Sequence, residues 1–151
     1  MTDLLRQEIA TAADTIVVKV GTRVLTHEDG TLDESRIARL GEEICQLLDA
    51  GRHVVLVSSG AVGAGMSQLG LTQRPQDVAR LQAVAAVGQA RLIEAYDRTF
   101  RKHGRTAGQV LLTADDVDDR TRYLNVRNTI RALLDFQAVP LINEHDTVAV
   151  E

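Results

Sequence analysis

The sequence lacks the features that mark several large classes of protein. Its 151 residues include a single cysteine, Cys45, which excludes an intrachain disulfide framework and fits a reducing compartment. Its apolar runs are too short to span a bilayer, and its polar N-terminus lacks the core of a signal peptide. With 17 basic and 21 acidic residues the net charge is −4, whereas nucleic-acid-binding domains usually carry a basic excess. We therefore expect a cytoplasmic protein that binds neither membrane nor nucleic acid.

Four short β-branched segments alternate with helical segments along the chain. The predicted strands cover 15–21, 53–59, 106–113 and 138–143. Apolar residues three and four apart mark the helices between them. The stripe predicted for the longest helix is Val78, Leu81, Ala85, Gly88, Leu92, Tyr96 and Phe100. This alternation predicts an α/β fold with a mainly parallel sheet covered on both faces.

The chain shows no repeat and no linker, so one domain is expected, with residues 1–14 as an N-terminal extension. The segment "HDTVAVE" after the fourth strand starts a new apolar stretch, which has neither a helix cap nor a polar tail. We interpret the chain as the first half of a larger domain. Cys45 lies in "EEICQLL", a setting that predicts a buried and unreactive thiol.

Polar residues follow three of the predicted strands. They are Lys19 to Gly21, Ser58 to Gly60, and the segment from Asn143 to Asp146. In parallel α/β sheets, ligands bind beyond the carboxyl ends of the strands. The three clusters therefore outline a candidate site at one rim of the sheet.

A glycine loop, "GAVGAG" at 60–65, follows the second strand. It matches neither the dinucleotide pattern G-x-G-x-x-G nor the phosphate loop G-x-x-x-x-G-K-[ST]. Backbone amides at a strand-to-helix turn can still form a nest for an anion. From the spacing alone, a ligand loop and a purely structural turn remain equally open.

Two further signals also have two interpretations. Lys19 points away from Ile16, Val18 and Val20 along its strand, and its charge can reach a phosphate or simply extend into solvent. The segment "NEHD" is a common turn composition, although Asp146 can accept a hydrogen bond from a substrate ammonium group. The histidines and the run "ADDVDD" lack the spacing of metal ligands, so no metal site is predicted from them.

Several motifs together carry a resemblance. "VVKVGT", "VSSGAVGAG", "AAVGQ", "GQVLLT", "RYLNVRNTIRALLD" and "VPLINEHDTVA" occur in this order. From about Thr15 to the last residue, the chain resembles the glutamate 5-kinases of the amino acid kinase family. The resemblance implies a three-layer αβα sandwich that uses ATP and Mg²⁺ to phosphorylate the side-chain carboxylate of L-glutamate. That reaction yields L-glutamyl 5-phosphate and opens proline biosynthesis.

The resemblance also implies roles for particular residues. Lys19 would be the catalytic lysine on the ATP phosphates, and Gly21 and Thr22 would form the adjacent loop. Ser59 and Gly60 would hold glutamate, and Asn143 and Asp146 would hold its α-amino end. His145 stands where the family motif usually has asparagine, which affects a hydrogen-bonding detail.

The same resemblance implies a protein longer than this chain. Residues 1–151 would be the N-terminal portion of the kinase domain, without the nucleotide-binding C-terminal part or a PUA domain, and inactive alone. A homo-oligomer and feedback inhibition by proline are further implications. Two alternatives remain: a related kinase for N-acetylglutamate, aspartate, carbamate or UMP, and a non-catalytic fragment that binds an amino acid.

Overall fold

Four parallel strands form a single sheet in the computed structural model, which describes residues 2–144. Their order across the sheet is β1-β2-β4-β3, so the last strand in sequence lies between the second and the third. The strands are β1 (Thr15–Val20), β2 (His53–Ser58), β3 (Thr106–Leu112) and β4 (Ala138–Glu144). All four predicted strands are present, and each ends within one residue of its predicted boundary.

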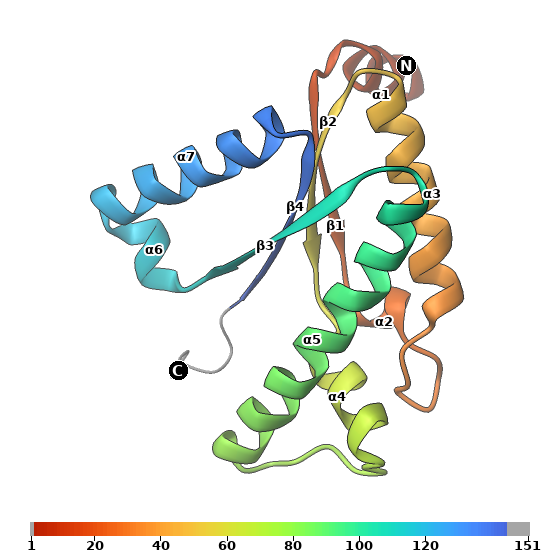
Figure 1. The fold of residues 1–151 in the computed structure, drawn as a ribbon, viewed down its shortest axis with the longest axis vertical. Helices are drawn as coiled ribbons and strands as arrows, with labels where there is room; N and C mark the ends of the chain where they lie inside the picture. Colours follow the sequence, from red (N-terminus) through yellow and green to blue (C-terminus); the bar gives the residue numbers. More distant parts are fainter. Residues whose placement is uncertain (1, 145–151) are drawn as a thin grey trace.

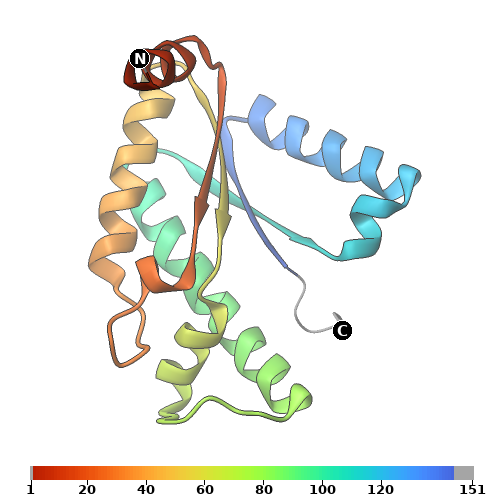
Figure 2. The same ribbon diagram turned by 180° about the vertical axis from the view of Figure 1, so that it is seen from behind.

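Helices cover the two faces of this sheet (Figures 1 and 2). One face carries α3 (Glu34–Asp49) and α5 (Val78–Lys102), which pack on β2 and β3. The other face carries α7 (Arg120–Asp135), which packs on β4 and follows the short α6 (Ala114–Asp118). The remaining helices are α1 (Thr2–Ala12), α2 (Thr22–Leu25) and α4 (Ala61–Leu69). The arrangement is the expected three-layer αβα sandwich.

The core lies between the sheet and the α3–α5 layer. Alternate residues of β2, Val54 and Leu56, belong to the same core cluster as Tyr96 and Phe100, and all four are fully buried. The two rings stack with their centroids 6.1 Å apart. Cys45 is part of the same cluster, and burial raises the pKa of its thiol. A thiol held protonated in this way is a poor nucleophile, as the sequence predicted.

Strand β1 divides its side chains between a covered and an open face. Val20 is buried and Val18 packs against the core, whereas Val17 is 64% exposed and Lys19 is exposed beside it. The alternation predicted for this strand is therefore confirmed. It leaves the Lys19 ammonium on the face of β1 that is not packed against α3 and α5.

The N-terminal extension forms the helix α1, and Arg52 binds the end of that helix to the start of β2. The guanidinium of Arg52, just before β2, donates to the carbonyl oxygens of Ala10, Thr11 and Ala13. These carbonyls lie at the end of α1, where helical carbonyls lack partners within the helix.

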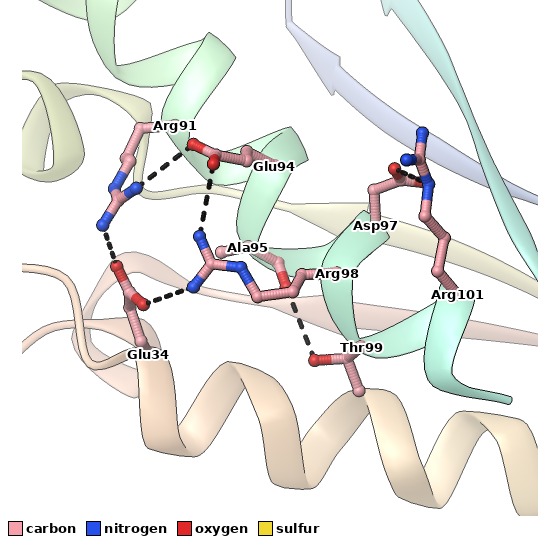
Figure 3. A network of polar contacts seen from close by, with 8 residues as sticks. All are labelled: Glu34, Arg91, Glu94, Ala95, Asp97, Arg98, Thr99 and Arg101. Atoms are coloured by element: carbon pink, nitrogen blue, oxygen red, sulfur yellow. Dashed lines mark hydrogen bonds and ion pairs between the residues drawn. The ribbon is translucent and has the colours of Figure 1, made fainter.

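Helices α3 and α5 are also joined at the surface by a chain of ion pairs (Figure 3). Arg91 contacts Glu34 and Glu94, and Arg98 contacts the same two carboxylates. Hydrogen bonds from Arg91 and Arg98 lower the pKa of Glu94. These side chains are partly exposed, so each pair contributes little to stability.

Helices α4 and α5 cross with their backbones in direct contact. A Cβ atom added to Gly88 would lie 1.6 Å from the carbonyl oxygen of Ala61, and one added to Gly65 would lie 1.9 Å from that of Val84. Both glycines are therefore required by packing. The predicted glycine loop is correspondingly shorter than expected: only Gly60 lies in a turn, because α4 already begins at Ala61.

The predicted stripe of α5 is confirmed over most of its length and is wrong at its start. Gly88, Leu92, Tyr96 and Phe100 are buried, but Val78 is 61% exposed. The first part of α5 projects beyond the carboxyl ends of the strands together with α4 (Figure 1), so no sheet lies beneath it.

Candidate functional site

A pocket of about 160 Å³ lies at the carboxyl ends of β1, β2 and β4. Its lining combines residues from four separate segments of the chain. They are Thr22, Ser59, Gly60, Ala61, Val62, Arg74 and Asn143. Four predicted site residues, Thr22, Ser59, Gly60 and Asn143, are thus gathered around one cavity, which is where parallel sheets place their ligands.

Gly60 shapes the wall of this pocket that is formed by α4. Its backbone has φ of +107°, a left-handed conformation that side-chain-bearing residues rarely adopt. As the N-cap residue of α4 it brings no side chain to the free amide groups of the first turn. Ala61 and Val62 of that turn line the pocket, so the positive end of the α4 dipole faces it. An anionic group would be stabilised there.

The two serines after β2 have different environments. Ser58 is buried, and its Oγ lies 3.1 Å from the hydroxyl oxygen of Tyr96. Ser59 lines the pocket, and its backbone N–H donates to the carbonyl oxygen of Val20 at 3.0 Å. That bond ties the pocket end of β2 to the end of β1. Ser58 therefore has a structural role in the core, whereas Ser59 faces the cavity.

Asn143 is held from the side of α5. Its Nδ2 atom donates to Oε1 of Gln89 at 2.7 Å. The other end of that amide, Nε2 of Gln89, is buried and has no acceptor among the described residues. An unpaired buried donor costs about 1–3 kcal/mol. Gln89 is not among the predicted site residues, although it lies in the motif "AAVGQ".

The predicted phosphate-binding residues lie at the end of β1. Gly21 is the N-cap residue of α2, and open space surrounds it where a Cβ would be. Lys19 is exposed and does not line the pocket. Among the ion pairs formed within residues 2–144, none includes Lys19. A lysine and an uncapped turn at a strand end fit the phosphate groups of a nucleotide.

One cation at the pocket was missed. Arg74 lies in the loop between α4 and α5, where the sequence shows only a polar break, and the structure places it on the pocket lining. Its neighbours in sequence give no periodic signal, so only the tertiary fold identifies it. The predicted site residue Asp146, with His145, lies outside the described residues.

A buried carboxylate organises the loop beside α4. Asp33 accepts hydrogen bonds from the Ser35 hydroxyl at 2.7 Å and from the Arg36 N–H at 3.1 Å, and so caps α3. The hydroxyl bond, followed by the backbone bond and the nearby His27 and Arg36, lowers the pKa of Asp33. The loop that it closes contacts α4, because a Cβ at Gly63 would lie 2.9 Å from the carbonyl oxygen of Gly30.

Within residues 2–144, no three His, Cys, Asp or Glu side chains gather in a group that could hold a metal ion. The run "ADDVDD" has a structural role instead: Asp116 accepts from the N–H and hydroxyl of Thr113 at the start of α6, and Asp119 caps α7. Across the same described residues, no helix is long and apolar enough to cross a membrane.

The chain is similar in sequence to known members of one protein family. The model of the amino acid kinase family matches residues 14–151. The glutamate 5-kinase of Rhodopirellula baltica is 51% identical over 146 residues, which are 97% of this chain and 38% of that protein. The glutamate 5-kinase of Moorella thermoacetica is 52% identical over 136 residues, which are 90% of this chain and 36% of that protein. The chain thus spans well under half the length of these relatives.

A solved structure supports the fold. Carbamate kinase from Giardia lamblia, bound to AMP-PNP, aligns with a TM-score of 0.52 over 89% of this chain and 57% of that chain. The two sequences are 18% identical, so the likeness concerns the fold alone.

Proposed function

Because this chain belongs to the amino acid kinase family, we propose that it forms the amino-acid-binding part of an ATP-dependent glutamate 5-kinase. The reaction would transfer a phosphoryl group to the side-chain carboxylate of L-glutamate, the first step of proline biosynthesis. The observation that carries the proposal is the pocket that gathers Thr22, Ser59, Gly60 and Asn143. The identity of about half to proteins named glutamate 5-kinase supports this substrate.

The chemistry requires little acid–base assistance from this chain. A glutamate side chain has a reference pKa of about 4.3, so the attacking carboxylate is already ionised at neutral pH. The difficulty is repulsion between anions, about 4 kcal/mol for two unit charges 4 Å apart at an effective dielectric constant near 20. ATP, when bound, supplies the phosphoryl group.

The residues of this chain offset that repulsion. We assign Lys19, with Gly21 and Thr22, to the ATP phosphates. We assign Ser59 and the first turn of α4 to the substrate carboxylate, since both lie on the pocket wall. Donors already in place where charge develops stabilise a transition state without reorganisation.

Asn143 and Asp146 would bind the α-amino end of glutamate in this proposal. Arg74 adds a positive charge at the pocket that suits an acidic substrate. Mg²⁺ is proposed to accompany ATP, and no step is assigned to that ion. We further propose that the enzyme is cytoplasmic and homo-oligomeric. We also propose that proline inhibits it and that a further part of the protein binds the nucleotide.

The test compares this chain with the full-length protein that contains it. ADP release is measured with glutamate, N-acetylglutamate, aspartate, carbamate and UMP as acceptors. The full-length protein is expected to use glutamate, and preference for another acceptor would overturn the substrate assignment. The chain alone is expected to show no turnover, because positioning fails when one reactant is not held.

A non-catalytic amino-acid-binding role is the second candidate, favoured by the fraction of the relatives that this chain spans. Isothermal titration of the chain with glutamate, proline and ATP measures binding independently of turnover. Binding of glutamate by a full-length protein that releases no ADP would favour the binding role over the kinase.

A further inference from the structure

Gln89 lies next to the point where α5 contacts α4. Its neighbour Gly88 lies against the carbonyl oxygen of Ala61 so closely that no side chain fits between them. Ala61 lines the pocket. This backbone contact therefore sets the distance between α5 and the pocket wall, and it brings the Gln89 amide within reach of β4.

Gln89 uses this position for one hydrogen bond. Its Oε1 accepts from Asn143 Nδ2 at 2.7 Å, while its own Nε2 is buried without an acceptor among the described residues. If both amides were turned around, the result would be the same, with one end of Gln89 paired and the other not. The side chain gains one bond and carries one unpaired polar group.

Such an arrangement is a poor device for stability. A methionine or leucine of similar size would fill the same space without a buried unpaired amide group, at the cost of the hydrogen bond to Asn143. The contribution that only an amide can make here is its bond to Asn143. That bond holds the plane of the Asn143 amide, and Asn143 lies on the pocket wall.

We propose that Gln89 is a positioning residue that acts through Asn143: it fixes the orientation of the Asn143 amide and thereby sets the affinity of the pocket for its amino acid. Gln89 does not itself line the pocket. The inference rests on the proposed function, because it takes the ligand of Asn143 to be the amino-acid substrate.

The test uses four variants of the full-length protein: Gln89→Met, Asn143→Ala, the double variant, and Gln46→Met. Gln46 is exposed on α3, so it gives the same substitution away from the pocket. The KM for glutamate, the KM for ATP, kcat and the melting temperature are measured for each.

In Gln89→Met we expect a roughly fivefold rise in the glutamate KM, which is the equivalent of one hydrogen bond. The ATP KM should be unchanged. The melting temperature should be unchanged or higher. Gln46→Met should match the wild type. In the Asn143→Ala background, Gln89→Met should add no further loss, because its route of action is already removed.

Three results would overturn the inference. They are an unchanged glutamate KM in Gln89→Met, additive losses in the double variant, and a fall in melting temperature that accounts for the lost affinity. The proposed function fails in a different way, through a wild-type protein that does not phosphorylate glutamate at all.

Discussion

The hydroxyl oxygen of Tyr96 lies 3.1 Å from Oγ of Ser58, and both side chains are almost completely buried. This hydrogen bond joins the second half of α5 to the last residue of β2, one position before the pocket residue Ser59. Burial raises the pKa of the Tyr96 phenol, so the hydroxyl stays protonated and can donate. The bond thus anchors the strand at the point where the pocket begins.

Tyr96→Phe should lower the free energy of unfolding by about 0.5–1.5 kcal/mol, because it removes one hydrogen bond of the buried Ser58 hydroxyl, which keeps its bond to the Ser59 carbonyl oxygen. Urea denaturation followed by circular dichroism measures the change. Tyr123→Phe is the matched control, since Tyr123 is 50% exposed on α7. Equal stability of the two variants would show that the Ser58–Tyr96 bond contributes nothing.

Gly88→Ala should be strongly destabilising, because its Cβ would overlap the Ala61 carbonyl oxygen and force α4 and α5 apart. Overpacking of this kind typically costs about 1–3 kcal/mol, and contact with backbone leaves little room for relief. Gly21→Ala is the control for stability, as it meets no atom within 4 Å. Similar melting temperatures for both variants would contradict the close crossing.

Acid should destabilise the fold through Asp33. Its pKa is lowered in the folded state by its hydrogen bonds, so its stabilising effect is present above the unfolded pKa of about 3.9 and is lost as the pH falls through the folded value. Asn at this position still caps the helix but does not titrate.

Wild-type stability should therefore fall more steeply than that of Asp33→Asn as the pH is lowered below about 4. Chemical denaturation at a series of pH values measures the slopes. Asp118→Asn, at an exposed site on α6, should keep the wild-type slope. Parallel curves for wild type and Asp33→Asn would exclude this role.

Lys19→Ala in the full-length protein should reduce turnover and leave the fold intact, because Lys19 is an exposed residue at the end of an edge strand. Loss of one stabilising contact to developing charge typically costs about 2.7–4 kcal/mol, or 10²–10³-fold in kcat. Steady-state kinetics and a melting curve measure the two effects. Lys102→Ala, exposed at the end of α5, should be normal. Near-normal turnover in Lys19→Ala would remove the phosphate role.

The layers of the fold and the rim that carries the pocket were predictable from local patterns. Runs such as 53–59 are short, apolar and bounded by polar turns, which predicts strands, and the helices between them predict that the strands are parallel. Since all parallel strands end at one rim, Ser59 and Asn143 could be placed together without knowing the order of the strands.

The sequence could not reveal contacts that depend on how the layers meet. Gly63 and Gly65 look like loop residues in the sequence, and only the approach of the Gly30 and Val84 carbonyls explains them. Arg74 reaches the pocket from a loop without a site pattern, and the motif "AAVGQ" that contains Gln89 gives no sign that its amide bonds Asn143. Their contribution depends on the crossing of α4 and α5, which no local periodicity encodes.

The strand order has a consequence for how the chain folds. Strand β3 has β4 as its neighbour in the sheet, yet β4 is made after it. During synthesis the edges of β3 therefore stay unpaired within this sheet until residues 138–144 have been made and lie between β3 and β2. Non-local strand pairing of this kind is slow and exposes intermediates to aggregation. Because Asn143 comes on that same strand, the residues that line the pocket come together only when β4 pairs with β2.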